Sequence, residues 1–244
     1  IYSKITGLSK PPMDVPMVIL SRCLFTLSFI VAIMMAVPGH ALTDQEEKIQ
    51  RSHITVQKIL QNEDIGPSVK ELLGRAKAIM IFPDLYKGAV VFGAEGGSGV
   101  LMAKGRKGRW SYPAFYFMGS GSIGLQFGAQ IAEVMLMIMT ERGLNALLNQ
   151  KVRIGGDVNA AMGPYGVGGK AATTTNLGAD IYTYSLNKGA FAGFSIEGAV
   201  IYPLEEWNKG YYGDAGARPR AIVIEGRFRN DHANRLRKSL ILSR

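Results

Sequence analysis

The spacing of apolar residues predicts helices at the start of the folded part of the chain. Ile49, Val56 and Ile59 recur on one side of a helix, so residues 42–60 are expected to begin the domain with an amphipathic helix capped at residue 43 or 44. A second helix is expected from Pro67 onward, because its apolar residues keep the same spacing and proline suits a first helical turn.

From residue 78 the pattern changes to apolar runs and alternation, which predict β-strands. The longest apolar run, residues 125–139, alternates in its first half and is interpreted as a strand, followed by a helix over residues 141–148. A short helical or turn segment is expected over residues 205–211. The other predicted strands cover residues 78–82, 88–92, 99–103, 110–118, 153–162, 170–175, 180–186 and 190–202, with turns at 94–98, 104–109 and 187–189.

The distribution of glycine adds curvature to the predicted strands. Of the 30 glycines, 25 lie between Gly88 and Gly216, among apolar residues. Within strands, glycine marks bulges, tight turns and close approaches of another backbone. The predicted fold is therefore α+β: a curved, mainly antiparallel, glycine-rich sheet, barrel-like or sandwich-like, with N-terminal helices and a few short helices.

The first 41 residues are interpreted as an upstream segment and a cleavable export signal. Arg22 precedes the uncharged run from Cys23 to Val37, and Pro38 and the small-residue ending at Ala41 follow it. This run is shorter than the roughly 20 apolar residues that a membrane span needs. The predicted organisation is a signal over 1–41, a domain over 42–213 and a basic tail over 214–244. No cysteine follows Cys23, so no disulfide framework is expected.

Charge is distributed unevenly along the chain. Residues 42–213 hold 17 Lys/Arg against 15 Asp/Glu, whereas residues 214–244 hold 8 against 3. The basicity is mostly a property of the tail, and no zinc-finger or RNP-type motif accompanies it, so no nucleic-acid partner is expected. A basic tail more often contacts anionic lipid or is solvated.

Catalytic and cofactor motifs are weak. Residues 119–124 fit the dinucleotide pattern G-x-G-x-x-G, but the residues that follow look like a strand and not like the helix that would receive a pyrophosphate. After residue 41 the histidines are His53 and His232, one in each terminal segment. No catalytic residue, cofactor or metal site is predicted, and a nucleotide-dependent enzyme using the loop from Gly119 to Gly124 remains an alternative.

The turn over residues 104–109 offers four cations next to aromatic residues. Lys104, Arg106, Lys107 and Arg109 precede Trp110, a combination suited to anionic headgroups at a membrane interface. A solvated hairpin tip explains the same residues equally well.

The chain resembles the SYLF domain family of bacterial exported proteins and of eukaryotic proteins in membrane traffic and cortical actin. The resemblance covers nearly all of residues 42–213. It rests on the segment from Ala76 to Pro83 with Lys87-Gly88, on Gly96-Gly97-Ser98-Gly99, on residues 119–148, and on the segment from Tyr184 to Gly198.

This resemblance implies a non-enzymatic phospholipid-binding module; phosphoinositide and actin binding are described for eukaryotic members. It attributes lipid contact to a basic, amphipathic N-terminal helix, which corresponds to residues 42–60 here. The chain departs from those members in its export signal, in lacking an SH3 or FYVE domain, and in its acidic start at Asp44, Glu46 and Glu47. These departures count against actin as its partner and weaken the expectation of phosphoinositide binding.

The sequence-based hypothesis is an exported bacterial protein, periplasmic or extracellular, that associates peripherally with the envelope and binds anionic phospholipid without catalysis. Another envelope protein is a further candidate partner, and an integral outer-membrane β-barrel is a second alternative class. The predicted lipid-binding residues are Lys48, Arg51, Lys58, Lys104, Arg106, Lys107, Arg109, Trp110, Arg235, Arg237 and Lys238.

Overall fold

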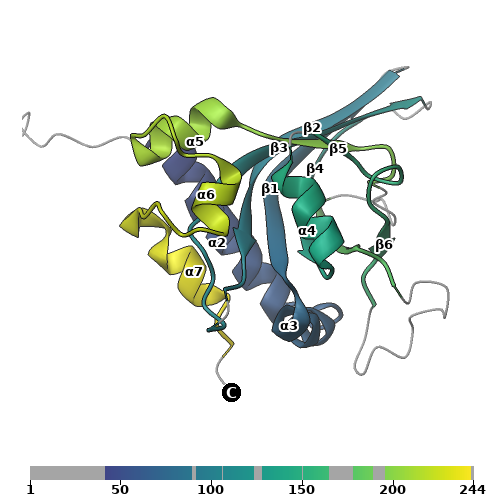
Figure 1. Cartoon of the computed structure of the whole chain (residues 1–244). Coiled ribbons are helices and arrows are strands. Elements are labelled where there is room, and N and C mark those ends of the chain that lie inside the picture. Colours follow the sequence, from purple (N-terminus) through teal and green to yellow (C-terminus); the bar gives the residue numbers. More distant parts are fainter. Residues whose placement is uncertain are drawn as a thin grey trace, which may run out of the picture. The chain divides into compact units, whose positions relative to one another are not determined.

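The computed structural model describes residues 42–89, 92–105, 107–123, 128–149, 151–164, 178–188 and 196–242 (Figure 1). The predicted export signal, Arg106 and the predicted strand over 170–175 lie outside the described residues. So do Gly124, the last residue of the G-x-G-x-x-G motif, residues 125–127 after it, Gly189 of the predicted turn, and residues 190–195 of the last predicted strand.

Two helices open the domain as the apolar spacing predicted. Helix α2 spans Asp44–Gln61 and begins with a capping box, in which the Thr43 hydroxyl accepts from the Glu46 amide and the Glu46 carboxylate accepts from the Thr43 amide. Helix α3 spans Gly66–Arg75, with proline in its first turn. The remaining helical elements are α4 (Glu141–Leu148), α5 (Glu205–Tyr212), α6 (Pro219–Val223), the 3-10 turn η3 (Asp231–Ala233) and α7 (Asn234–Ser239).

An eight-stranded sheet forms the centre of the described structure, in the order β5-β8-β3-β2-β1-β4-β7-β6. All pairs are antiparallel except β6 with β7, and the sheet is strongly curled (Figure 1). The predicted α+β class with a curved, mainly antiparallel sheet is thereby confirmed. The strands are β1 (Ala78–Ala89), β2 (Phe92–Ala103), β3 (Ala114–Ile123), β4 (Gly128–Ile138), β5 (Val152–Arg153), β6 (Ala160–Met162), β7 (Ile181–Lys188) and β8 (Val200–Pro203).

Side chains of the central strands alternate between two separate apolar cores, one on each face of the sheet. On β1, Met80 and Phe82 face one core while Ile79 and Ile81 face the other, and all four are fully buried. The first core is covered by α4 and α6, and the second by α2, α3 and α7. Figure 1 shows α4 and α2 on opposite faces of the sheet. Burial on both faces explains the near-continuous apolar runs of β1 and β4.

The predicted strand pair around a turn at residues 94–98 is wrong. Residues 94–98 lie inside β2, which pairs with β1 over almost its whole length with an irregularity between Ile81 and Tyr86. The glycines there serve close approach: a Cβ at Gly97 would collide with the carbonyl oxygen of Asp84, and one at Gly99 with that of Ile81. Glycine therefore brings the two strands together at a bulge and does not end them.

Two further segments differ from the sequence-based prediction. The single strand expected over residues 153–162 is split into β5 and β6 by a turn, in which Gly155 has φ 86° and the Asp157 carboxylate accepts from the Arg153 amide at 2.7 Å. In the glycine motif, residues 119–123 are the extended end of β3 and pair with β2. Where this motif is described it therefore opens no helix that could receive a pyrophosphate.

The segment after Gly213, which we set apart as a basic tail, packs on the sheet and on α2. Ile222 of α6 joins the first core, and Ala233 and Leu236 of the last turn and helix join the second, all fully buried. Residues from Leu42 onward belong to one compact unit. The high density of Lys and Arg had obscured the helical spacing of the few apolar residues in this segment.

Candidate functional site

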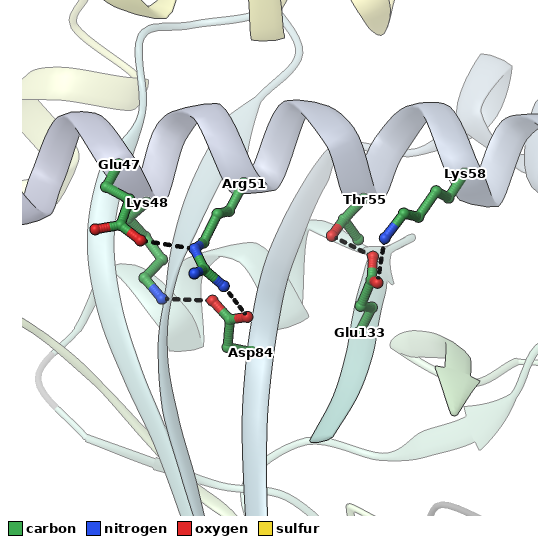
Figure 2. A network of polar contacts seen from close by, with 7 residues as sticks. All are labelled: Glu47, Lys48, Arg51, Thr55, Lys58, Asp84 and Glu133. Carbon is green, nitrogen blue, oxygen red and sulfur yellow. Dashed lines mark hydrogen bonds and ion pairs between the residues drawn. The ribbon is translucent and has the colours of Figure 1, made fainter. Parts of the chain in front are cut away.

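The cations of α2 reach carboxylates of the sheet (Figure 2), while the side chains of Arg51 and Lys58 stay 48% and 45% exposed. Lys48 Nζ lies 3.1 Å from Asp84 Oδ2, and Arg51 Nη1 lies 2.7 Å from Asp84 Oδ1. Arg51 also pairs with Glu47 at 2.8 Å, and the Glu47 hydrogen bond, ahead of the Asp84 charge, raises the pKa of the guanidinium above its ordinary value. Asp84 is a residue of the β1 bulge and is 7% exposed.

A second buried carboxylate, on β4, contacts the same face of α2. Glu133 of β4 accepts a 2.7 Å hydrogen bond from the Thr55 hydroxyl and lies 2.6 Å from Lys58 Nζ. Lys48, Arg51, Thr55 and Lys58 follow one another at three- and four-residue intervals, so they share one helix face. Figure 2 shows this face lying over Asp84 and Glu133. A groove runs along α2 here, with Gln50, Ile54 and Pro83 also in its walls.

These contacts give the three predicted lipid-binding cations of α2 a structural partner inside the domain. The apolar residues Ile49, Val56 and Ile59 of α2 are also buried inside the domain. They pack in the second core and are at most 2% exposed. Neither Glu133 nor Asp84 was among the residues predicted for the site. The signal available for Asp84 was an acidic residue directly after Pro83, at the end of the apolar run from Ala78 to Phe82.

The turn from Lys104 to Trp110 is held by two of its own predicted site residues. Lys104 Nζ donates to the carbonyl oxygens of Leu73 at 3.1 Å and Gly74 at 2.8 Å, at the negative end of the α3 dipole. Trp110 is 2% exposed, and its indole N–H donates to the Leu240 carbonyl at 3.0 Å. Both residues therefore anchor the turn to neighbouring helices.

Arg237 of α7 completes this attachment. Its Nε donates to the Trp110 carbonyl at 3.0 Å, and its guanidinium carbon lies 3.9 Å from the centre of the Tyr112 ring. The basic turn and the basic C-terminal helix, which are far apart in sequence, are therefore side by side. The structure brings together two groups of cations that the sequence had presented separately.

Four of the predicted residues remain directed to solvent. Lys107 and Arg109 of the turn, and Arg235 and Lys238 of α7, are exposed and form no ion pair with the residues that the structure describes. Lys107 and Arg109 line a shallow hollow together with Trp110, Ser111, the last residue of α6, Val223, and Ile224 and Gly226 after it. We call the four exposed cations the basic patch.

The described residues thus define a class: a curled, mainly antiparallel sheet with helices on both faces and a basic patch beside its C-terminal helix. Comparison with known proteins gives the family. The family described as "Ysc84: Las17-binding protein actin regulator" matches residues 119–241, about half of the chain. The chain belongs to this family, which confirms the SYLF resemblance, and the match includes most of the segment after Gly213.

Curated relatives come from fungi and vertebrates. The chain is 29% identical over 190 residues to LAS seventeen-binding protein 3 of Saccharomyces cerevisiae, which covers 77% of this chain and 40% of the relative. It is 29% identical to Protein YSC84 of the same yeast, over 70% of this chain and 37% of the relative. It is 28% identical to SH3 domain-containing YSC84-like protein 1 of Xenopus laevis, over 68% and 49%. The chain therefore spans less than half the length of these relatives.

Among the helices that the structure describes, none combines the length and the apolar character that crossing a membrane requires.

Proposed function

We propose that this protein is a non-enzymatic module that binds the surface of anionic phospholipid membranes through the basic patch. The observation that carries the proposal is the placement of Lys107, Arg109, Arg235 and Lys238 on adjoining elements, exposed and without ion pairs among the described residues. Membership of the Ysc84 family supports a binding role over a catalytic one. We further propose, from the pattern of residues 1–41, that the protein is exported and works at the cell envelope.

The attraction expected from such a patch is modest and depends on salt. Each basic residue close to an anionic surface contributes about 1 kcal/mol, and the effect decays within a Debye length of roughly 10 Å at moderate ionic strength. Four residues therefore provide about 4 kcal/mol, which corresponds to about a thousandfold gain in affinity. Binding should be reversible and should weaken as salt is added.

Vesicle flotation of the full chain tests the proposal. Wild-type protein should float with vesicles containing phosphatidylglycerol and not with vesicles of phosphatidylcholine alone. The triple variant Lys107→Ala, Arg109→Ala, Lys238→Ala should bind about a hundredfold more weakly, since about 3 kcal/mol is removed.

A matched variant controls for net charge. Lys70→Ala, Lys151→Ala and Arg153→Ala remove the same charge from exposed residues on α3, just before β5 and in β5. Equal losses in the two triple variants would show that only net charge matters, and an unaffected patch variant would exclude the patch. Cosedimentation with actin filaments, measured in parallel, tests the activity that the family description names.

A further inference from the structure

Two strongly exposed isoleucines border the basic patch. Ile224 follows α6 and is 46% exposed, and Ile241 follows α7 and is 59% exposed. Ile224 lines the same hollow as Lys107 and Arg109. Ile241 comes directly after Leu240, whose carbonyl accepts the Trp110 hydrogen bond from the base of the turn. Single exposed apolar residues are ordinary, but here two of them flank one group of cations that form no ion pair within the described part of the chain.

Backbone hydrogen bonds fix the segments that carry both isoleucines. After Ile224 the chain turns through Gly226 at φ 65°, and the Arg227 amide donates to the Ala221 carbonyl at 3.0 Å. The Ile241 amide donates to the Lys238 carbonyl at 3.1 Å. The residues just before them, Val223 and Leu240, are at most 5% exposed. The two side chains are therefore fixed at the surface of a packed core, and their exposure does not come from a loose segment.

We propose that Ile224 and Ile241 insert among the acyl chains of an anionic bilayer while the basic patch contacts the headgroups. This inference rests on the proposed function and adds an orientation to it. The ends of α6 and α7 and the turn from Lys104 to Trp110 face the membrane. Ala89 of β1 and its partner Gly93 of β2 lie at the opposite end of these strands, away from the bilayer.

A bilayer fits this surface because of its charge and its layout. The cations come from the turn and from α7, and the acid beside Ile224, Glu225, is paired with Arg227 at 3.8 Å. The surface thus carries separate cations and, beside them, two exposed isoleucines. This arrangement matches a bilayer, in which phosphates lie above hydrocarbon. A hollow lined by cations alone would suit a soluble anion just as well. The exposed isoleucines favour a bilayer, because a soluble anion offers no hydrocarbon for them to contact.

Tryptophan reporters test the insertion in the full chain. Ile224→Trp and Ile241→Trp each add a fluorophore to a background in which Trp110 is buried and Trp207 half-buried. Vesicles of phosphatidylglycerol carrying bromine on their acyl chains should quench the added fluorescence of both variants. Tyr86→Trp, at a position on β1 that is 54% exposed, is the control and should not be quenched.

A second pair of variants separates insertion from charge. Ile224→Ser with Ile241→Ser should weaken vesicle binding about tenfold and leave its salt dependence unchanged, whereas the triple lysine and arginine variant flattens the salt dependence. Thermal unfolding should be unaffected by either serine, because both isoleucines are exposed.

The outcomes distinguish the inference from the function. Binding without quenching at positions 224 and 241, or serine variants that bind like wild type, would overturn insertion and leave the proposed function standing. Competition of vesicle binding by inorganic phosphate alone would do the same, since it would indicate a headgroup contact only. Failure of wild-type protein to bind any anionic vesicle would overturn both.

Discussion

Thr55 on α2 donates a 2.7 Å hydrogen bond to Glu133 on β4, joining residues 78 positions apart in the sequence at a site where both are almost fully buried. A carboxylate removed from water is costly unless it is paired and hydrogen-bonded. Glu133 is satisfied by α2 alone among the contacts described, through Thr55 and Lys58. This polar pair therefore fixes how α2 lies on the sheet, in addition to the apolar contacts of the helix.

The first prediction concerns this pair. Thr55→Val leaves one carboxylate oxygen without its donor and should lower the free energy of unfolding by about 1–3 kcal/mol. Glu133→Gln should cost a similar amount, because it removes the charge that Lys58 faces. In urea unfolding of the full chain, the double variant should cost less than the two single variants added together, giving a coupling of about 1 kcal/mol. Additive losses would mean that the hydroxyl and the carboxylate do not interact.

The second prediction concerns the glycines at the β1 bulge. Gly97→Ala should destabilise the protein by about 1–3 kcal/mol, because the new methyl group meets the carbonyl of Asp84 and pushes β1 away from β2. Gly74→Ala is the control: it is a helical position in α3 with open space around it, where alanine should add up to about 1 kcal/mol of stability. Thermal unfolding compares them. If both substitutions raise the melting temperature, the two strands are not as close as described.

The third prediction concerns pH and His53. Burial, and then the positive charge of Arg235, lower the pKa of His53 below its ordinary value, and its Nδ1 is buried without a partner among the described residues. Because the folded pKa lies below the unfolded one, the unfolded chain binds more protons. Stability is then fully present above the unfolded pKa of about 6.5 and is lost as pH falls below it.

Urea unfolding measured from neutral to mildly acidic pH checks this effect. His53→Gln should flatten the loss of stability below about pH 6.5, since the group that binds the extra proton in the unfolded chain is gone. His232→Gln is the matched control, at an exposed position. An unchanged pH profile in the His53 variant, or the same change in both variants, would contradict the assignment.

The placement of α2 bears on how lipid contact is interpreted in this protein. The resemblance implied contact through residues 42–60, but the apolar face of α2 is buried and its cations face Asp84 and Glu133. Contact by the apolar face would require breaking these ion pairs and opening the second core. The basic patch requires neither step, which is why the proposal places lipid contact there.

Local patterns in the sequence were sufficient to predict many elements. Helix α4 was predicted with its observed bounds from residues 141–148, and in the structure the Thr140 hydroxyl caps it by accepting from the Gly143 amide. The curved sheet was likewise predicted from glycine among alternating apolar residues. Strand ends were predicted less well: glycine at 96, 97 and 99 looks the same in sequence whether it ends a strand or lets two strands approach.

The roles of the charged and aromatic residues were decided by tertiary structure. Lys48 and Lys107 are both lysines in basic segments, yet Lys48 meets Asp84 from 36 residues away while Lys107 remains exposed. Trp110 was expected at an interface and is buried, because Leu240, 130 residues later, accepts its hydrogen bond. Apolar and glycine patterns act over a few residues and can be seen in the sequence. Whether a cation is paired or free depends on which distant segment folds against it, and no local pattern contains that information.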